Sequence, residues 1–530
     1  MSRGQWLPGR DAAAVRHPGT PGRLRDDREH SVVVVGGGVA GLAAATALAE
    51  RDVAVTVVEA QDRLGGRVRA WPASQRPDGA TGTPTSMSRG FHAFFRQYYN
   101  LRGLLRRTDP ALERLRPLAD YPLVSRAGYQ DSFARIPRTP PLNLMAFVLA
   151  SRTFTLRDLR RIDTDAAGEL LDVEFPRTFT DHDGESAAAF LDRMRFPPAA
   201  RHLALEVFAR SFFADPAEFS AGELIGMFHT YFLGSAEGLL FDVPDDDYDT
   251  TLWAPLGAYL TDRGAGIRTG TAVTAVRSGA DGVVVDTAAG PLHADAVVVA
   301  TDRAATQRLL GAPDALRADQ EWRRHLLSGR SAPPFAVWRL WLDRPAHADR
   351  PPFLGTAEYG CVDNISLVDR FEDGAASWAQ RTGGSVVELH AYALPAQADH
   401  DAVRAEMLAV LAELYPELAG AHAVADSYLV EDDCPLVGTE PWASRPGVVT
   451  PDPRVVLAGD GIRCEFPVAL MERAATTGFQ AANRLLAGWQ LAGHDLWTVP
   501  LGARTWLARH AGRAAARRTG SPAAAAPVRG

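Results

Sequence analysis

Three glycines and one glutamate have residue types and a spacing suited to holding a nucleotide. Gly36, Gly38 and Gly41 form a G-x-G-x-x-G pattern, and Glu59 lies 23 positions after Gly36. In this pattern the first glycine permits a tight turn, the second lets a pyrophosphate approach the backbone, and the third lets a helix pack closely on a strand. The helix N-terminus then offers free N–H groups to the phosphates. Glu59 can accept hydrogen bonds from both ribose hydroxyls, which favours an adenosine ribose without a phosphate.

The elements that position these residues follow from the hydrophobic pattern. SVVVV at 31–35 predicts a short buried strand, GGGVAGLAAATALAE a turn into a helix, and VAVTVVEA a second strand. Two more α/β segments lie far downstream. Residues 267–302 predict strands and turns, and residues 454–486 predict a strand that ends in Gly459-Asp460 before an alanine-rich helix. The predicted nucleotide-binding domain is therefore discontinuous.

Composition argues against several classes of function. The net charge is −8 and the isoelectric point is about 6.0, so the overall electrostatic field disfavours binding of nucleic acid. All 56 basic residues are arginines, which excludes P-loop phosphate binding and Schiff-base chemistry through a lysine amine. No run of eighteen apolar residues predicts a membrane-spanning helix. Three distant cysteines predict neither zinc nor a disulfide framework and favour a reducing cytoplasm: Cys361, Cys434 and Cys464.

Four motifs, in order, resemble the FAD-dependent amine-oxidase and carotenoid-desaturase superfamily. They are VVVVGGGVAGLAAATALAERDVAVTVVEA, DRLGGRV at 62–68, ADAVVVATD, and VVLAGDGIRCEFPVALMERAATTG. The G-G-R after the second strand, paired with the C-terminal A-G-D and M-E helix, separates two-dinucleotide flavoproteins from NAD dehydrogenases. The resemblance implies an α/β fold class, in which a discontinuous two-dinucleotide-binding (Rossmann-like) FAD domain accompanies a mixed α+β substrate domain.

The expected domains follow the motifs. The FAD-binding domain takes residues 31–120, 266–305 and 446–490, and the substrate and membrane-contact domain takes residues 121–265 and 306–445. Residues 1–30 and 511–530 have low-complexity compositions and are predicted to be a disordered arm and tail.

The resemblance implies positions for the FAD. Glu59 would bind the adenosine ribose, Arg67 would lie near the pyrophosphate and flavin, and Asp460 would lie beside the pyrophosphate and ribityl chain. Val273 would contact the adenine side through its backbone. Met471 would begin a helix aimed at the flavin, whose N-terminus stabilises negative charge on reduced flavin. The implied cofactor-binding set is Gly36, Gly38, Val39, Ala40, Gly41, Glu59, Ala60, Gly66, Arg67, Gly90, Val273, Gly459, Asp460 and Met471.

Three segments narrow the resemblance. RGFHAFFRQYYNLRGLLRR at 89–107 resembles plant-type carotenoid desaturases, while residues 209–256 and GGSVVELHAYAL at 383–394 are similar to the isorenieratene synthase type, the β-carotene desaturase/methylase. That class turns a β-ionone ring into a trimethylphenyl ring. Each ring loses four hydrogens in two hydride-level oxidations, and one methyl moves from ring carbon 1 to carbon 2. FAD can take each hydride, and a developing carbocation explains the methyl shift without a methyl donor.

His92 and Glu465 are the candidate proton acceptors, because imidazole and carboxylate groups suit that task. His92 lies in a predicted turn near the flavin, and Glu465 follows the Gly-Asp motif. The alternatives are a His92 that only orients the cofactor and a Glu465 that only faces solvent. PDDDYD at 244–249 fits the D-D-x-x-D spacing that binds magnesium diphosphate. It follows a proline in a predicted loop without a second aspartate-rich partner, so we interpret it as a solvated loop and predict no metal.

Carotenes reside in bilayers, so the implied partners are a lipophilic carotenoid, a membrane surface and an electron acceptor that the sequence does not identify. Residues 140–161 pair an apolar run with flanking arginines, as a monotopic membrane segment does, with a core helix as the alternative. Residues 496–518 could add a second contact. We expect a cytoplasmic protein that associates peripherally with membranes.

The arginine- and aromatic-rich segment 89–107 raises nucleic-acid binding as a possibility, which the negative net charge disfavours. We instead predict a turn over 89–92 that brings His92 toward the flavin, followed by a helix from Phe94. Its aromatic rings would line the core or a polyene tunnel, and its arginines would form a solvated or lipid-headgroup face.

Other functions remain open at this point. A linear-polyene desaturase or isomerase of the ζ-carotene type shares the flavin motifs and is the main alternative. A flavin amine oxidase is disfavoured because many such enzymes place a lysine near flavin N5. A non-enzymatic flavin or lipid carrier is the remaining alternative.

Overall fold

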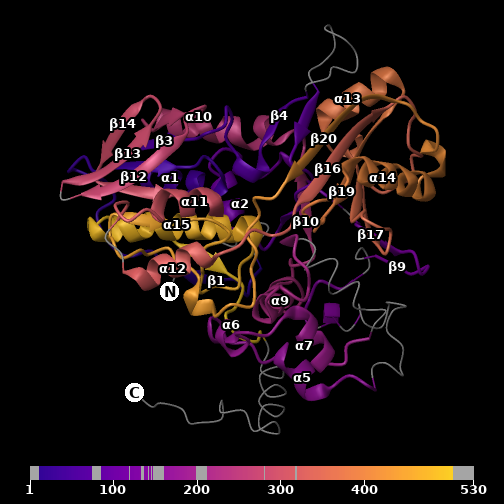
Figure 1. Ribbon diagram of the computed structural model, residues 1–530, viewed down its shortest axis with the longest axis horizontal. Helices are drawn as coiled ribbons and strands as arrows, with labels where there is room; N and C mark the ends of the chain where they lie inside the picture. Colours follow the sequence, from indigo (N-terminus) through magenta and orange to yellow (C-terminus); the bar gives the residue numbers. More distant parts are fainter. Residues whose placement is uncertain are drawn as a thin grey trace.

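The computed structural model describes residues 11–73, 85–118, 120–132, 136–140, 142–144, 146, 160–197, 212–279, 281–316 and 319–504 (Figure 1). Three parts are visible: a layered α/β part, a large mixed sheet, and a group of short helices.

A five-stranded parallel sheet forms the centre of the first part. Strands of a parallel sheet are buried on both faces, so they consist of nearly continuous apolar residues. Val32 and Val34 pack in one core cluster while Val33 and Val35 pack in another, and none of the four is more than 3% exposed. The strand order is β11-β3-β2-β15-β21. The strands are β2 (Ser31–Val35), β3 (Ala54–Val58), β11 (Gly266–Arg268), β15 (Ala296–Val299) and β21 (Val455–Leu457). This sheet confirms the predicted α/β, Rossmann-like fold class. The proposed boundaries between the two domains stay a prediction.

Helices cover one face of this sheet, and a small antiparallel sheet with two helices covers the other (Figure 1). All eleven residues of the alanine-rich α1 are buried, because small side chains let it fit between the sheet and α15. On the first face lie α1 (Val39–Ala49), α2 (Tyr99–Leu105) and α15 (Leu470–Gly488). On the second lie β12 (Val273–Gly279), β13 (Gly282–Thr287), β14 (Gly290–Ala294), α11 (Arg303–Leu310) and α12 (Gln320–Ser328).

The second part is a seven-stranded sheet in the order β20-β16-β19-β18-β17-β8-β9. Val387 and Leu389 of β19 pack with Met407 of α14 in an apolar cluster. Side chains alternate along a strand, so Glu388 and His390 point to the opposite face. The elements are β8 (Leu123–Ser125), β9 (Gln130–Asp131), β16 (Phe335–Leu342), β17 (Phe353–Ala357), β18 (Asn364–Leu367), β19 (Ser385–Ala391), β20 (Ala423–Glu431), α13 (Asp373–Thr382) and α14 (His400–Leu414).

The third part and the connections consist of short elements. The helices are α5 (Thr164–Glu169), α6 (Arg177–Asp181), α7 (Ala187–Arg193), α9 (Ala221–Phe228) and α10 (Ala254–Asp262), with π-helical turns at His229–Leu233 and Asp249–Trp253. The remaining strands are β4 (Ala70–Pro72) paired with β5 (Ser86–Ser88), and β6 (Phe94–Phe95) and β7 (Leu115–Pro117) on either side of β10 (Phe241–Pro244).

The predicted disordered arm at 1–30 is wrong for residues 11–30. β1 (Val15–His17) pairs antiparallel with β22 (Leu496–Thr498), and the His17 ring stacks on Phe466 at 4.4 Å between ring centroids. Backbone pairing with a distant strand holds this segment, and local composition gives no sign of such a partner. Residues 1–10 and the predicted tail at 511–530 lie outside the described residues, as does most of the predicted membrane segment at 140–161.

The prediction for residues 89–107 is wrong in two respects. Phe94–Phe95 is a strand paired with β10, and the helix begins only at Tyr99. The arginines do not form a solvated face: Arg96 and Arg102 both bind Asp242, at 2.9 and 2.7 Å, and Arg102 is 5% exposed. A buried charge is retained only when it is paired, and the partner lies 140 residues away in the sequence.

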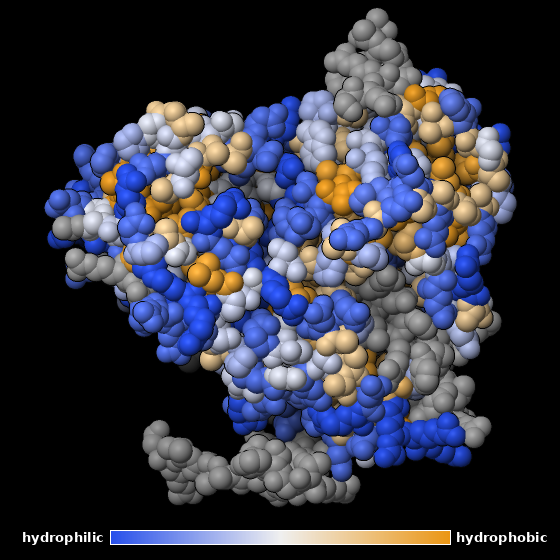
Figure 2. All heavy atoms as spheres, viewed as in Figure 1, coloured by the Kyte–Doolittle hydropathy of each residue, from blue (hydrophilic) through white to orange (hydrophobic). Residues whose placement is uncertain are grey.

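Hydrophilic side chains predominate on the face seen in Figure 2, with smaller apolar patches between them. Large exposed apolar residues sit on separate elements, such as Leu327 on α12 and Leu408 on α14. Within the described ranges, no helix has both the length and the apolar character needed to cross a bilayer.

Candidate active site

A cavity of about 690 Å³ extends from the glycine-rich turn after β2 to the polar face of the seven-stranded sheet. Gly36, Gly38 and Glu59 line one end, and His390 and Tyr392 line the other. The cavity therefore extends from the predicted nucleotide site to a second region beside His390 and Tyr392, which we call the chamber.

The glycine turn is shaped to bring a ligand close to the backbone. Gly36 has φ +107°, a left-handed conformation that side chains rarely adopt, and a Cβ at Gly41 would overlap the Gly36 carbonyl oxygen. No side chain caps the N-terminus of α1, so its first N–H groups are free for an anion. The Glu59 carboxylate is held in place by the backbone N–H groups of Gly37 at 2.7 Å and Gln61 at 2.8 Å.

The middle of the cavity is bordered by the start of α15 and a half-buried ion pair. Arg67 donates two hydrogen bonds to Asp460, at 2.9 and 2.5 Å. The Gly459 N–H donates to the Thr477 hydroxyl of α15 at 2.9 Å, which fixes the Gly-Asp turn against the helix. The N-terminus of α15 also lacks a side-chain cap, and Met471 in its first turn lines the cavity.

Behind this helix start, Arg473 and Arg445 share the buried carboxylate of Glu223. Arg473 donates to Oε2 at 2.5 Å and Arg445 to Oε1 at 2.9 Å. Burial disfavours the charged guanidinium, yet Glu223 raises the pKa of Arg473. This triad ties the start of α15 to α9, and so fixes the helix end that faces the cavity.

The segment 89–92 brings His92 to the cavity. Its predicted approach to the flavin stays a prediction. Gly90 has φ +104°, and its carbonyl oxygen accepts hydrogen bonds from His92 Nδ1 at 2.8 Å and from the Tyr248 hydroxyl at 2.9 Å. A carbonyl oxygen only accepts, so Nδ1 carries the proton and Nε2 is an acceptor. Burial lowers the pKa of His92 to about 4, and the imidazole is therefore neutral at physiological pH.

The neutral state of His92 predicts a loss of stability in acid. Unfolded histidine titrates near 6.5, so the unfolded state binds more protons between pH 6.5 and 4, and the free energy of unfolding falls as the pH drops through that range. His92→Gln can still donate to Gly90 but does not titrate. Between pH 7.5 and 4.5 we expect the free energy of unfolding, measured with urea, to fall by about 2–3 kcal/mol less in the variant than in the wild type.

His229 and His494, whose pKa values burial also lowers to about 4, titrate in both proteins. The difference between the two proteins therefore isolates His92. An identical pH dependence would contradict a neutral His92.

Aromatic rings line the chamber beyond His92. Phe91 lies 4.6 Å from Phe353, and Phe95 lies 4.7 Å from Tyr231 and 5.2 Å from Phe241, measured between ring centroids. These rings come from four separate segments of the chain. The aromatic residues that line the cavity are Phe91, Phe95, Tyr98, Tyr121, Tyr129, Phe212, Phe213, Tyr231, Phe241, Phe335, Phe353 and Tyr392.

The matching protein family is described as flavin containing amine oxidoreductase, and it matches residues 39–486. The chain belongs to this family. Its fold agrees with solved structures at low identity. An oxidoreductase from Methanosarcina mazei has a TM-score of 0.60 at 17% identity and covers 85% of this chain and 99% of its own. Cyclohexylamine oxidase from Brevibacterium oxydans has a TM-score of 0.58 at 17% identity, covering 87% and 99%.

Curated relatives of this flavin-containing chain have higher identity. A protein of Streptomyces griseus named carotenoid phi-ring synthase is 53% identical over 94% of this chain and 96% of its own length. One of the same name from Chlorobaculum tepidum is 27% identical, covering 88% and 90%. A probable zeta-carotene desaturase of Synechococcus elongatus is 25% identical, covering 87% and 99%.

The cofactor is FAD, and the residues present fit it. Two uncapped helix N-termini, a glycine turn without room for side chains and an anchored Glu59 match the needs of a dinucleotide. The predicted FAD-binding residues that line the cavity are Gly36, Gly38, Val39, Ala40, Glu59, Ala60, Gly66, Arg67, Val273, Gly459, Asp460 and Met471. Gly41 and Gly90 do not line it: Gly41 packs against the Gly36 backbone, and Gly90 packs against the His390 and Val337 side chains.

The prediction of Glu465 as a proton acceptor is corrected, because the structure does not bring its side chain to the cavity. Its side chain is exposed, while the neighbouring Cys464 is 2% exposed and points inward. Closeness in sequence to the Gly-Asp motif is misleading here, because the chain turns between the two.

Two of the four aspartates at 244–249 are ion-paired. Asp245 binds Arg114 at 2.9 Å, and Asp249 binds Arg63 at 2.7 Å. Among the described residues, no group of His, Cys, Asp and Glu side chains is arranged to hold a metal ion.

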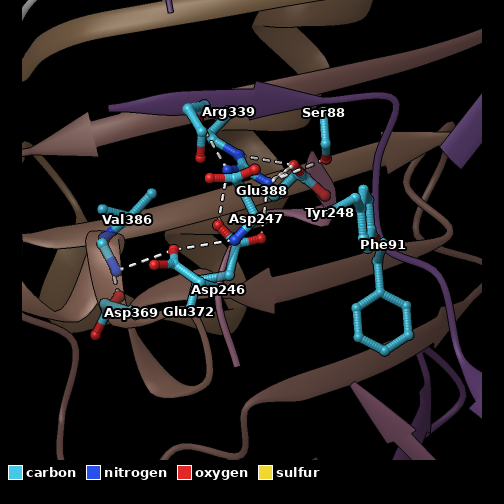
Figure 3. Close-up of polar contacts among 12 residues, drawn as sticks. Ser88, Phe91, Asp246, Asp247, Tyr248, Arg339, Asp369, Glu372, Val386 and Glu388 are labelled. Atoms are coloured by element: carbon cyan, nitrogen blue, oxygen red, sulfur yellow. Dashed lines mark hydrogen bonds and ion pairs between the residues drawn. The ribbon is translucent and has the colours of Figure 1, made fainter. Parts of the chain in front are cut away.

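A buried charged cluster lies beside the chamber, and local sequence patterns do not predict it. Arg339 of β16 lies between Glu388 of β19 and Glu372, with Ser88 next to it (Figure 3). Its guanidinium is 2.8 Å from Glu388 and 3.1 Å from Glu372. The only signal was in GGSVVELHAYAL, where polar residues alternate with apolar ones in a strand pattern.

Proposed function

We propose that this protein desaturates and aromatises the β-ionone ring of a carotene, with a 1,2-methyl shift and FAD as the oxidant. The observation that carries the proposal is the 53% identity, over 94% of the chain, to a protein named carotenoid phi-ring synthase. The cavity supports it, because an aromatic chamber suited to an apolar ring adjoins the FAD site.

The chemistry needs an oxidant and two proton acceptors for each ring. A ring loses four hydrogens, as two hydride equivalents and two protons, while one methyl moves from ring carbon 1 to carbon 2. FAD, when bound, supplies the hydride acceptor. The chamber's rings hold the apolar substrate, exclude water and present aromatic faces to a developing ring cation.

His92 is the first proposed proton acceptor. Its neutral imidazole lines the cavity, and its Nδ1–H is fixed on the Gly90 carbonyl, which leaves Nε2 as an acceptor. A proton leaving a carbocation is acidic enough to transfer even to a base whose pKa is about 4. Glu465 is not proposed, since its side chain is exposed.

A linear-polyene desaturase or isomerase is the second candidate. The 25% identity to a probable zeta-carotene desaturase over 87% of the chain favours it. An aromatic chamber would also accommodate the end of a linear polyene.

Product analysis separates the two candidates. FAD-loaded protein in phosphatidylcholine vesicles is expected to convert β-carotene into a product lighter by four hydrogens per ring, with an aromatic ring by NMR. Oxidised-flavin absorbance should decrease in a single turnover without an added electron acceptor. Conversion of ζ-carotene but not β-carotene would overturn the first proposal.

We also propose peripheral contact with a membrane, since the substrate resides there. The protein should sediment with the same vesicles and be released by salt or detergent. Failure to sediment with carotene-containing vesicles would contradict this contact and leave the ring chemistry to the product analysis.

A further inference from the structure

Three polar side chains at the end of β19 form a hydrogen-bonded line. Glu388 and His390 are alternate residues of β19, so both project to the face of the sheet that is turned away from α14, and Tyr392 directly follows the strand. Glu388 and His390 are each 1% exposed, while Tyr392 and His390 line the cavity. The line therefore runs from a buried carboxylate to the substrate chamber.

The hydrogen-bond partners indicate which atom donates and which accepts at each step from Tyr392 to Glu388. His390 Nε2 lies 2.8 Å from Glu388 Oε1 and 3.4 Å from the Phe91 N–H; the shorter contact is to a carboxylate, which accepts, so we assign the proton to Nε2. His390 Nδ1 is then an acceptor, and the Tyr392 hydroxyl 2.8 Å away donates to it. The Tyr392 oxygen in turn accepts from the Asn364 amide at 3.0 Å. A proton added at the Tyr392 oxygen can therefore pass along existing bonds to His390.

Two carboxylates and one guanidinium form a charged cluster behind His390. Although burial opposes ionisation, Arg339 and His390 lower the pKa of Glu388 to about 2, so Glu388 is charged. Burial raises the pKa of Glu372 to about 7 even though Arg339 contacts it. Arg339 is the only cation that contacts these two carboxylates among the described residues. When both carboxylates are ionised, Glu388, Glu372 and Arg339 together carry a net charge of −1 beside His390.

We propose that Tyr392 accepts a proton from the substrate ring and passes its own hydroxyl proton to His390. This rests on the proposed ring aromatisation. In the ring cation left by hydride loss to FAD, a C–H bond breaks and its electron pair forms the new C=C bond. The released proton goes to the Tyr392 oxygen as the Tyr392 hydroxyl proton moves to His390 Nδ1. The resulting imidazolium keeps its Nε2–H on Glu388.

The relay supplies the second of the two proton acceptors that each ring requires. Tyr392 is the catalytic residue of the pair, since it faces the chamber, and His390 and Glu388 act through it as positioning residues. Gly90 has a part in this arrangement, because a Cβ there would lie 2.5 Å from His390 Cε1.

The test compares two tyrosines whose hydroxyl groups are each hydrogen-bonded to a histidine. Tyr392→Phe removes the hydroxyl at the chamber. Tyr428→Phe removes a hydroxyl that lies 3.0 Å from His400 Nδ1 at the outer edge of the same sheet, away from the cavity lining. Both FAD-loaded variants are assayed with β-carotene in vesicles for kcat, KM, FAD content, melting temperature and product composition.

We expect Tyr392→Phe to lower kcat by about 10²-fold, with KM, FAD content and melting temperature close to those of the wild type. Rings that have lost only two hydrogens should accumulate, because the second proton has no acceptor. Tyr428→Phe should behave as the wild type. Glu388→Gln, which keeps a hydrogen bond but removes the charge, should lower kcat in the same direction.

Other outcomes overturn one proposal or the other. If the wild type converts β-carotene and Tyr392→Phe matches its rate and products, the relay is wrong and the ring chemistry stands. Equal losses of kcat, FAD and melting temperature in Tyr392→Phe would mean a structural role and also overturn the relay. A wild type that forms no aromatic ring overturns the proposed function and the relay with it.

Discussion

Replacing Arg339 with methionine is expected to lower the free energy of unfolding by about 3–5 kcal/mol. The arginine is 2% exposed and binds two buried carboxylates, Glu388 and Glu372, together with the Ser88 hydroxyl. Without Arg339, the Glu388 and Glu372 carboxylates remain in the protein interior, which disfavours their charged forms. They must then be protonated in the folded state, so the loss should be larger at pH 8 than at pH 5. Urea unfolding at both pH values measures it.

Arg116→Met is the matched control. Arg116 binds Asp373 at 2.8 Å, but the two side chains are 43% and 57% exposed, and such pairs contribute about 0–1 kcal/mol. Adding Glu388→Gln and Glu372→Gln to Arg339→Met should restore part of the stability, because no buried charge is then left unpaired. A loss no greater than that of Arg116→Met would show that the cluster is not balanced by Arg339.

The FAD half of the site was predictable because its signals are local. The strand, the glycine turn, the helix and Glu59 lie within thirty residues, and each residue type has one dominant physical reason to be there. The same holds for the Gly459-Asp460 turn before α15. The strand β21, which comes just before this turn, positions the N-terminus of α15.

The substrate half depends on register between distant strands, which no local pattern specifies. Arg339 meets Glu388 because β16 and β19 pair residue to residue, 49 positions apart in the chain. Phe94 and Phe95 form a strand because β10, almost 150 residues later, is there to pair with them. In isolation, their spacing from Tyr98 and Leu101 looks helical. Tertiary pairing prevails over that local pattern.

Gly478→Ala is expected to weaken FAD binding by at least about tenfold and to cost roughly 1–3 kcal/mol of stability, the usual range for overpacking a core. Gly478 lies in the middle of α15, against α1. A Cβ there would overlap the Ala40 carbonyl oxygen and come within 2.9 Å of the Ala43 Cβ. Both helices point their N-termini at the cavity, so separating them displaces both ends of the FAD site. Flavin absorbance of the purified protein and thermal unfolding measure the two effects.

Gly488→Ala makes the same substitution at the end of the same helix, where a Cβ would have nothing within 4 Å. Alanine is favoured over glycine in a helix by about 0.5–1 kcal/mol, so this variant should keep its FAD and be as stable as the wild type or slightly more so. The same gain in helix propensity applies to Gly478→Ala. A net loss of stability in that variant therefore comes from the contact between α1 and α15. If the two variants bind FAD equally, the approach of α1 to α15 does not determine the shape of the site. The glycine turn at 36–41 would then have to hold the pyrophosphate without support from α15.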